Sequence, residues 1–224
     1  MIDSLSPNHE PRPADTPVDM LVFHYTGMAD AATALARLRD PEAKVSAHYL
    51  VDEDGTVHRL VPEDRRAWHA GEAAWRGHGD VNARSIGIEL VNPGHDLGYR
   101  PFPEAQMRAA IALARAVIQR HPVPPRNVVG HADVAPERKK DPGELFDWRR
   151  LAGEGVGLWA EPVTADGGPA GDVLPDLLHR FGYPVSDDDP IPAVTAFQRH
   201  FRPERVDGMP DAECAARAAA LLDR

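Results

Sequence analysis

The segment Gly130–Gly143 constrains this chain more than any other part of the sequence. It places an imidazole (His131), an ammonium (Lys139) and a carboxylate (Asp141) within eleven residues. Its prolines prevent the segment from being one continuous helix. The apolar pair Val128–Val129 directly before it predicts a short strand that leads into His131.

A second histidine, His24, directly follows the apolar run Met20–Phe23, which is typical of a buried strand. Strands are rigid, so two imidazoles at strand ends can be aimed at one point. Asp141 adds an oxygen ligand with a negative charge. Two imidazoles and one carboxylate form a ligand set suited to catalytic zinc, with a fourth position left for water. The chain has 11 histidines, so it is the sequence context of His24 and His131, rather than their residue type, that indicates a metal site.

Amide hydrolysis at such a site needs a base that moves a proton and a donor that holds the developing oxyanion. Glu89 is the candidate base, because the strand residues Ile86, Ile88 and Leu90 surround it. An exposed alternate strand position explains this glutamate equally well. Lys139 is the candidate oxyanion donor, and a solvated loop lysine is the simpler alternative.

The remaining pattern predicts an α/β fold. Apolar runs at 47–51 and 57–61 flank an Asp-Gly turn and predict a hairpin. Residues 85–91 predict a further central strand, and the apolar spacing from 103 to 120 predicts an amphipathic helix. We therefore expect one mixed central sheet flanked by helices.

Composition changes divide the chain into four parts. Residues 1–18 are expected to be an extended lead-in and residues 19–162 the catalytic domain, while the glycine- and proline-rich stretch 163–172 predicts a linker. Apolar residues at helical spacing then predict a three-helix domain over 173–224. Every candidate site residue precedes Pro142, so this last domain is expected to be dispensable for the chemistry.

The charge and the cysteine content exclude several classes of function. The formal net charge is −10, from 35 acidic and 25 basic residues, which argues against nucleic acid or an anionic membrane as a partner. The single cysteine, Cys214, excludes an intramolecular disulfide and a multi-cysteine zinc site, and its alanine-rich surroundings favour a small buried side chain. Nothing in the sequence implies a partner protein.

No stretch of the chain approaches the ~18 apolar residues of a membrane span. The N-terminus shows no basic start followed by an apolar core. The sequence therefore predicts a cytoplasmic protein without membrane insertion. A periplasmic or cell-envelope protein from which a leader was removed is the alternative.

Five segments occur together in an order that is familiar from one family: Phe23–Gly27, Ser46–Tyr49, Ala67–Gly71, Ser85–Glu89 and Gly130–Gly143. They resemble the N-acetylmuramoyl-L-alanine amidases of the amidase_2 class, which share their fold with peptidoglycan recognition proteins. The resemblance runs from about Met20 to Pro162. It implies cleavage of the amide between the muramic acid lactyl group and L-alanine in peptidoglycan or (anhydro)muropeptides, in wall turnover or recycling.

The same resemblance implies roles for five residues. His24, His131 and Asp141 would bind one Zn²⁺ per chain, Glu89 would act on the attacking water, and Lys139 would stabilise the oxyanion. A non-catalytic peptidoglycan recognition module of the same fold is the alternative, although recognition alone needs neither a metal nor a base.

Contacts to the substrate are less sharply indicated. The residues that could line a groove for sugar or peptide, with packing as the alternative for each, are Tyr25, His48, Trp68, His69 and Trp75. The tail around 193–211 resembles a three-helix peptidoglycan-binding module, but it lacks a clear set of exposed aromatic side chains.

Overall fold

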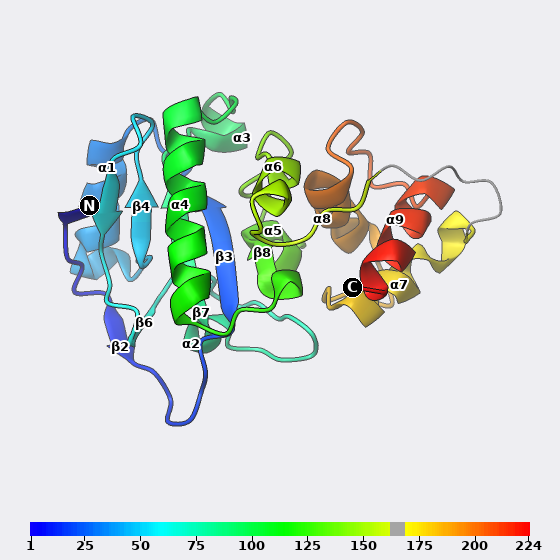
Figure 1. Ribbon diagram of the computed structural model, residues 1–224, viewed down its shortest axis with the longest axis horizontal. Coiled ribbons are helices and arrows are strands. Elements are labelled where there is room, and N and C mark those ends of the chain that lie inside the picture. The colour runs from blue at the N-terminus through cyan, green and yellow to red at the C-terminus, as the bar shows by residue number, and fades with distance from the viewer. Residues whose placement is uncertain (162–168) are drawn as a thin grey trace.

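The computed structural model describes residues 1–161 and 169–224. A six-stranded sheet has the strand order β1-β5-β4-β7-β3-β8, and the long helix α4 lies across one face of it (Figure 1). The strands of this sheet are β1 (Ile2–Asp3), β3 (Met20–Tyr25), β4 (Tyr49–Val51), β5 (Val57–Arg59), β7 (Ser85–Leu90) and β8 (Val128–Gly130). A separate antiparallel pair consists of β2 (His9–Pro11) and β6 (Arg65–Ala67). Since both parallel and antiparallel pairs occur in the sheet, the predicted mixed sheet flanked by helices is confirmed.

Helices lie between groups of strands as far as β8, and the described part of the chain after β8 contains helices without further strands. They are α1 (Ala31–Arg39), α2 (Val81–Arg84), α3 (Gly94–Leu97), α4 (Glu104–Arg120), α5 (His131–Val134), α6 (Trp148–Gly153), α7 (Leu174–Phe181), α8 (Ile191–Phe201) and α9 (Ala212–Leu222). Among the described residues, no helix is both long enough and apolar enough to cross a bilayer.

Strand β3 lies between β7 and β8 and runs parallel to both. Because side chains alternate along a strand, Leu21 and Phe23 pack in the apolar cluster under α4, while Val22 packs on the opposite face. His24 shares that opposite face with Val22. In the register of the two strands, His24 lies beside Glu89 of β7. The sheet thus brings a predicted metal ligand and the predicted base together, on the face that α4 leaves free.

The predicted local elements are confirmed. The hairpin is β4 and β5, which pair antiparallel, and the amphipathic helix is α4. Asp30 caps α1 by accepting a hydrogen bond from the backbone N–H of Thr33 at 2.7 Å. Cys214 is buried.

The first eighteen residues contribute strands to the fold, which the expectation of a simple lead-in missed. β1 pairs with the edge strand β5, and β2 pairs with β6. Beyond β2, the Arg12 guanidinium donates hydrogen bonds to four backbone carbonyls, which are those of Glu63, Asn82, Ala83 and Ser85. These strands are too short to show a period in the sequence, so hydrophobic patterning could not reveal them.

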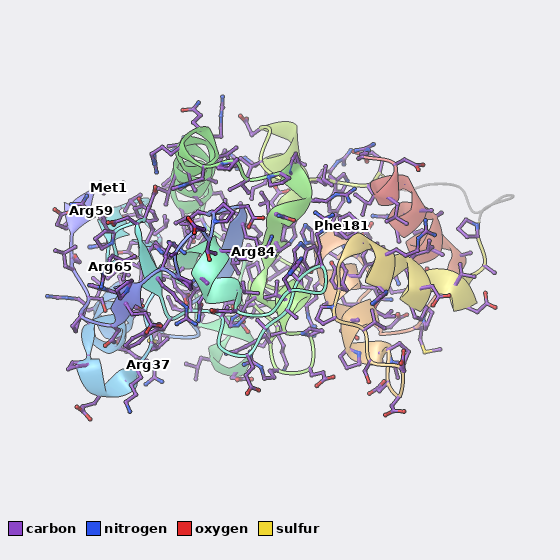
Figure 2. All side chains as sticks on the ribbon, turned by 90° about the horizontal axis from the view of Figure 1, so that it is seen from below. Met1, Arg37, Arg59, Arg65, Arg84 and Phe181 are labelled. Carbon is purple, nitrogen blue, oxygen red and sulfur yellow. The ribbon has the colours of Figure 1, made fainter. Side chains whose placement is uncertain are left out.

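The three predicted C-terminal helices are α7, α8 and α9, and they gather at the end of the molecule far from the N-terminus (Figure 1). Phe181, seen among them in Figure 2, belongs to the same apolar cluster as Val22 of the sheet and Trp75. Of the predicted linker, residues 163–168 lie outside the described residues, and Gly171–Val173 forms a 3-10 turn. The helices therefore share one continuous core with the sheet region.

Replacing Arg12 by alanine is expected to lower the free energy of unfolding by about 3 kcal/mol, because several carbonyls lose a charged donor in a partly buried site. Urea unfolding of the whole chain measures this difference. The matched control is Arg39→Ala, since Arg39 reaches the same N-terminal segment through one exposed hydrogen bond of 3.3 Å to the Leu5 carbonyl. Equal losses in the two variants would contradict the anchoring role of Arg12.

Candidate active site and metal centre

Three ligand atoms from three segments meet at the carboxyl end of β3. His24 is the penultimate residue of that strand, His131 follows β8 directly, and Asp141 lies in the loop beyond α5. His24 Nδ1 lies 3.0 Å from His131 Nδ1 and 3.1 Å from Asp141 Oδ2, and His131 Nδ1 lies 3.0 Å from the same carboxylate oxygen. All three side chains are buried. The structure thus brings together the three residues that the sequence indicated as ligands.

The proton of the His131 ring points away from this meeting point. Its Nε2 lies 3.0 Å from the backbone carbonyl oxygen of Ala70, which can only accept a hydrogen bond. Nε2 therefore carries the proton, and the lone pair of His131 Nδ1 faces His24 and Asp141.

A chain of hydrogen bonds fixes the His24 ring in the same way. Ser85 donates its hydroxyl to the Val81 carbonyl oxygen at 2.6 Å, so its Oγ accepts from His69 Nε2 at 3.1 Å. His69 Nδ1 is then unprotonated and accepts from His24 Nε2 at 3.0 Å. His24 Nδ1 is left with its lone pair directed at His131 and Asp141.

Gly87 makes room for the His69 ring. A Cβ at Gly87 would lie 2.6 Å from the ring carbon Cγ of His69, which is closer than atoms pack. The glycine on β7 is therefore what lets the ring reach across the strand to His24 and Ser85. Of the residues predicted as possible substrate contacts, His69 lines the cavity but serves mainly as the hydrogen-bond partner of a ligand.

The electrostatics give His24 and Asp141 the forms that bind a cation. Burial lowers the pKa of His24 to about 4, and the neighbouring His131 acts in the same direction. Burial opposes ionisation of Asp141, but His131 and His24 hold its pKa well below its usual range. A neutral His24 imidazole and a carboxylate are thus present at neutral pH, as metal binding requires.

Glu89 lies beside this group in a buried position. Its side chain has an exposed fraction of 9%, which excludes the solvent-facing alternative. Within the described part of the chain, its Oε2 has no hydrogen-bond partner. Burial raises the pKa of Glu89 well above its usual range, and the Asp141 carboxylate raises it further. An unpaired, buried carboxyl group with a raised pKa is what a proton-transferring group requires.

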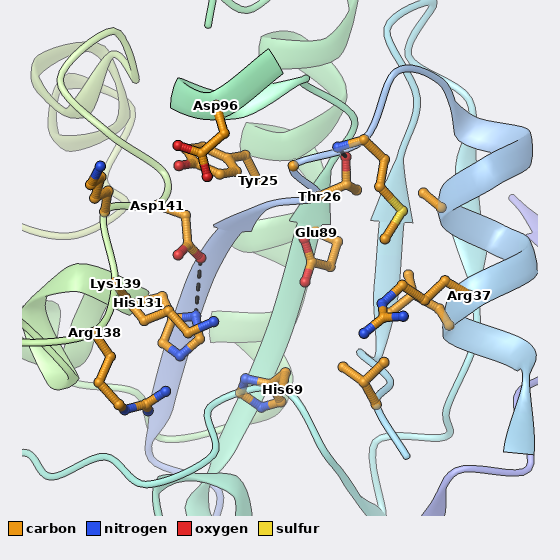
Figure 3. A pocket seen from close by; sticks show the side chains of 16 residues that line it. Tyr25, Thr26, Arg37, His69, Glu89, Asp96, His131, Arg138, Lys139 and Asp141 are labelled. Atoms are coloured by element: carbon orange, nitrogen blue, oxygen red, sulfur yellow. Dashed lines mark hydrogen bonds and ion pairs between the residues drawn. The ribbon is translucent and has the colours of Figure 1, made fainter. Parts of the chain in front are cut away.

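Lys139 and Glu89 point into one cavity from opposite sides, with His131 and Asp141 beside them (Figure 3). The cavity has a volume of about 370 Å³. The backbone N–H of Lys139 donates to the Ala135 carbonyl at 3.0 Å, which holds the lysine in a turn directly after α5. The lysine therefore lies within the site and is not a detached surface residue.

Tyr25 also lines the cavity, as the sequence predicted. Its hydroxyl lies 2.9 Å from His95 Nδ1, and the other ring nitrogen of His95 lies 3.2 Å from the Glu144 carboxylate. Burial raises the pKa of Tyr25 to about 12, so its hydroxyl stays protonated.

The structure corrects three of the predicted substrate contacts. His48 is fully buried, accepts a hydrogen bond from the Gly87 backbone N–H at 3.0 Å and lies outside the cavity lining. Trp75 is fully buried against the C-terminal helices, edge-on to Phe181 at 5.9 Å. Trp68 donates from its indole to Glu10 at 3.2 Å, also away from the cavity. Aromatic content could not separate a groove from a core, because the covering elements come from distant parts of the chain.

Sequence reasoning missed other residues around the cavity. Arg37 on α1 faces the cavity from the side opposite Arg138 (Figure 3), and Asp96 lies at its rim. Arg37 has the spacing of an ordinary solvated helix residue, so no sequence signal marks it.

Comparison with known proteins agrees with this geometry. The model of the Amidase_2 family, N-acetylmuramoyl-L-alanine amidase, matches residues 14–144. The chain is 41% identical to the N-acetylmuramoyl-L-alanine amidase AmiD of Escherichia coli over 232 residues, which cover 92% of this chain and 83% of that protein. It is 37% identical to the 1,6-anhydro-N-acetylmuramyl-L-alanine amidase AmpD of Enterobacter cloacae, over 65% of this chain and 85% of that protein.

Solved structures show the same relationship. The E. coli AmiD, in complex with the substrate anhydro-N-acetylmuramic acid-L-Ala-D-γ-Glu-L-Lys, superposes with a TM-score of 0.84 at 41% identity, covering 94% of this chain and 91% of that one. AmpDh3 of Pseudomonas aeruginosa, in complex with anhydromuramic pentapeptide, gives a TM-score of 0.84 at 34% identity, covering 94% of each chain. The ligand geometry, the family match and these similarities agree, and the chain belongs to the N-acetylmuramoyl-L-alanine amidases of the Amidase_2 family.

Proposed function

We propose that this amidase is zinc-dependent and hydrolyses the amide between the lactyl group of anhydro-N-acetylmuramic acid and the L-alanine of the stem peptide. One observation carries the proposal. Two imidazole lone pairs and one carboxylate oxygen converge within 3.1 Å of one another, next to a buried glutamate whose carboxyl oxygen has no partner among the described residues.

The donor set fits zinc. Tetrahedral zinc with bonds of about 2.0–2.1 Å to nitrogen and oxygen would separate its ligand atoms by about 3.3 Å. The separations here, 3.0 to 3.1 Å, are close to that value. His24, His131 and Asp141 would hold the ion and leave one position open. When bound there, zinc would polarise the substrate carbonyl and lower the pKa of a water molecule.

Glu89 and Lys139 would supply the proton transfer and the oxyanion stabilisation that the metal ligands do not provide. Glu89 lies beside His24 in the sheet and lines the same cavity as His131 and Asp141, so it could take a proton from the attacking water and return it to the leaving nitrogen of L-alanine. Lys139 faces the same space and can stabilise the negative charge that develops on the carbonyl oxygen. Burial in the sheet restricts Glu89, and a backbone hydrogen bond holds the turn that carries Lys139, before the substrate arrives.

The relatives and the charged residues of the cavity support this substrate class. The AmpD relative is named as an amidase of 1,6-anhydro-N-acetylmuramyl-L-alanine. The ligands bound in the AmiD and AmpDh3 structures contain an anhydromuramic group. A γ-linked D-glutamate keeps its α-carboxylate free, so the stem peptide carries a negative charge near the scissile bond. Arg37 and Arg138 line the cavity and complement that charge. A soluble anhydromuropeptide is therefore the substrate that we propose, in recycling of wall material, with the cytoplasm as the predicted location.

One zinc ion per chain is expected to bind, and His131→Ala is expected to abolish stoichiometric binding because the ligand set loses one of its two imidazoles. Metal analysis after dialysis against limiting zinc measures the content. The matched control is His121→Ala, since His121 bonds Glu63 away from the cavity. Full zinc content in His131→Ala, or none in the unaltered chain, would refute the assignment.

Glu89→Gln preserves the shape of the side chain and is expected to lower kcat by roughly 100- to 10,000-fold, because the proton-transferring group is lost. Lys139→Met is expected to lower kcat by on the order of 100-fold, the effect of removing one oxyanion donor. Release of the stem peptide from anhydromuropeptide, followed by mass spectrometry, measures both. The control is Glu137→Gln, an exposed glutamate near Lys139 in sequence, and both site variants should retain their zinc.

The proposed substrate class is tested by comparing anhydromuropeptides with intact sacculi. The rate per scissile bond is expected to be higher on the soluble fragments. Faster release from intact sacculi would point to the cell wall itself as the substrate, and fractionation of cells that express the native gene would then locate the enzyme.

A further inference from the structure

Asp133 is a buried carboxylate two residues after the ligand His131, and three donors converge on it. The backbone N–H of Gly130, which directly precedes the ligand, donates to Oδ2 at 2.6 Å. The hydroxyl of Tyr183 donates to Oδ1 at 2.8 Å, and His200 Nδ1 donates to Oδ2 at 2.7 Å. The last two donors belong to the C-terminal part of the chain. The turn that presents His131 is thus tied to that part through one side chain.

His200 also reaches the other two ligand-bearing segments through Trp148. The His200 ring stacks on Trp148 with centroids 3.7 Å apart and planes 17° apart. Trp148 lies edge-on to Phe23 at 5.7 Å, and Phe23 directly precedes His24. A pair of residues that adjoins the ligands His131 and Asp141 lies near the same tryptophan.

That pair is Gly130 and Pro142, which precede and follow the ligands His131 and Asp141. A Cβ at Gly130 would lie 2.7 Å from Pro142 Cδ and 3.3 Å from a ring carbon of Trp148. Phe23 and Gly130, the immediate neighbours of His24 and His131, therefore pack against one indole ring, and Pro142, which follows Asp141, packs against Gly130. His200 of α8 stacks on the same indole.

We propose that Tyr183 and His200 are positioning residues for the metal centre, and that the C-terminal helices are a working part of the amidase site. The proposal rests on the zinc site proposed above. A carboxylate held by three donors in a dry environment has little freedom, because charge-assisted hydrogen bonds are short and directional. Fixing Asp133 fixes the Gly130–His131 turn, and a metal site tolerates displacements of only about 0.5 Å.

This proposal replaces the expectation that the C-terminal helices are dispensable for the chemistry. That expectation considered only the positions of the ligands along the chain, all of which precede Pro142. The residues that we propose to support the ligands, Tyr183 and His200, lie more than forty positions after Pro142.

The test uses the full chain and removes donors without removing rings. Tyr183→Phe keeps the aromatic contact with Trp75, at 5.2 Å between centroids, and deletes only the hydroxyl. His200→Phe keeps a ring between Trp148 and Phe201 and deletes only the donor. The matched control is Tyr49→Phe, which deletes a tyrosine hydroxyl that donates to Glu63 at 2.7 Å outside the cavity.

Three quantities are measured: the zinc dissociation constant by competition with a chromophoric chelator, the visible spectrum of the cobalt-substituted protein, and the thermal midpoint of the metal-free protein. The Tyr183→Phe/His200→Phe double variant is expected to bind zinc about 10-fold more weakly, as found for outer-shell partners of metal ligands. Its cobalt spectrum is expected to shift, because the ligand geometry changes. Tyr49→Phe is expected to leave both readouts unchanged, whatever it does to the thermal midpoint.

An unchanged zinc dissociation constant and cobalt spectrum in the double variant would overturn the proposal, even if the thermal midpoint fell. An equal loss of affinity in Tyr49→Phe would overturn it as well, because the effect would then be one of general stability. If the double variant does not fold, Tyr183→Phe alone decides by the same criteria. Failure of the unaltered chain to bind zinc would instead overturn the proposed metal site, and this proposal with it.

Discussion

The structure depends on the convergence of two imidazole lone pairs and one carboxylate in a buried place. Acceptors that face one another at 3.0 to 3.1 Å without a proton between them repel, and burial removes the water that would otherwise compensate. A cation at the centre would make the arrangement favourable, so the proposed metal site would couple folding to metal binding. The surrounding strands and loops hold the three side chains so that their ligand atoms face one another.

The register of the sheet places these residues next to one another. Parallel pairing of β3 with β7 and β8 places His24 beside Glu89 and brings the end of β8, which leads into His131, next to β3. The two ring protons are then directed outward to acceptors, His69 for one ring and the Ala70 carbonyl for the other. Because residues 69 and 70 are adjacent in the chain, one segment fixes the tautomers of both imidazoles.

The positions of the strands could be predicted from the sequence, but the burial of individual side chains could not. Strand ends were predictable from apolar runs, so His24 and His131 could be placed at strand ends before the fold was known, and the family resemblance assigned them to one site together with Asp141. Glu89 could not be distinguished from an exposed strand residue, because its burial depends on neighbours on both sides, and β4 and β3 supply these from elsewhere in the chain. Trp75 and His48 were misassigned for the same reason, since the groups that cover them do not adjoin them in sequence.

The interface between sheet and C-terminal helices illustrates why an apolar core alone would not serve this enzyme. The shared cluster around Trp75, Phe181 and Phe197 stabilises the interface by burying apolar surface, but apolar contact is non-directional and tolerates small shifts. Asp133 contributes what that cluster cannot, because its carboxylate is satisfied only when Tyr183 and His200 occupy defined positions. A buried charge with one donor missing is strongly unfavourable, so a displaced helix would cost far more than the lost contact area. The polar network therefore adds orientation to an apolar contact, which is the role that we propose for it in holding His131.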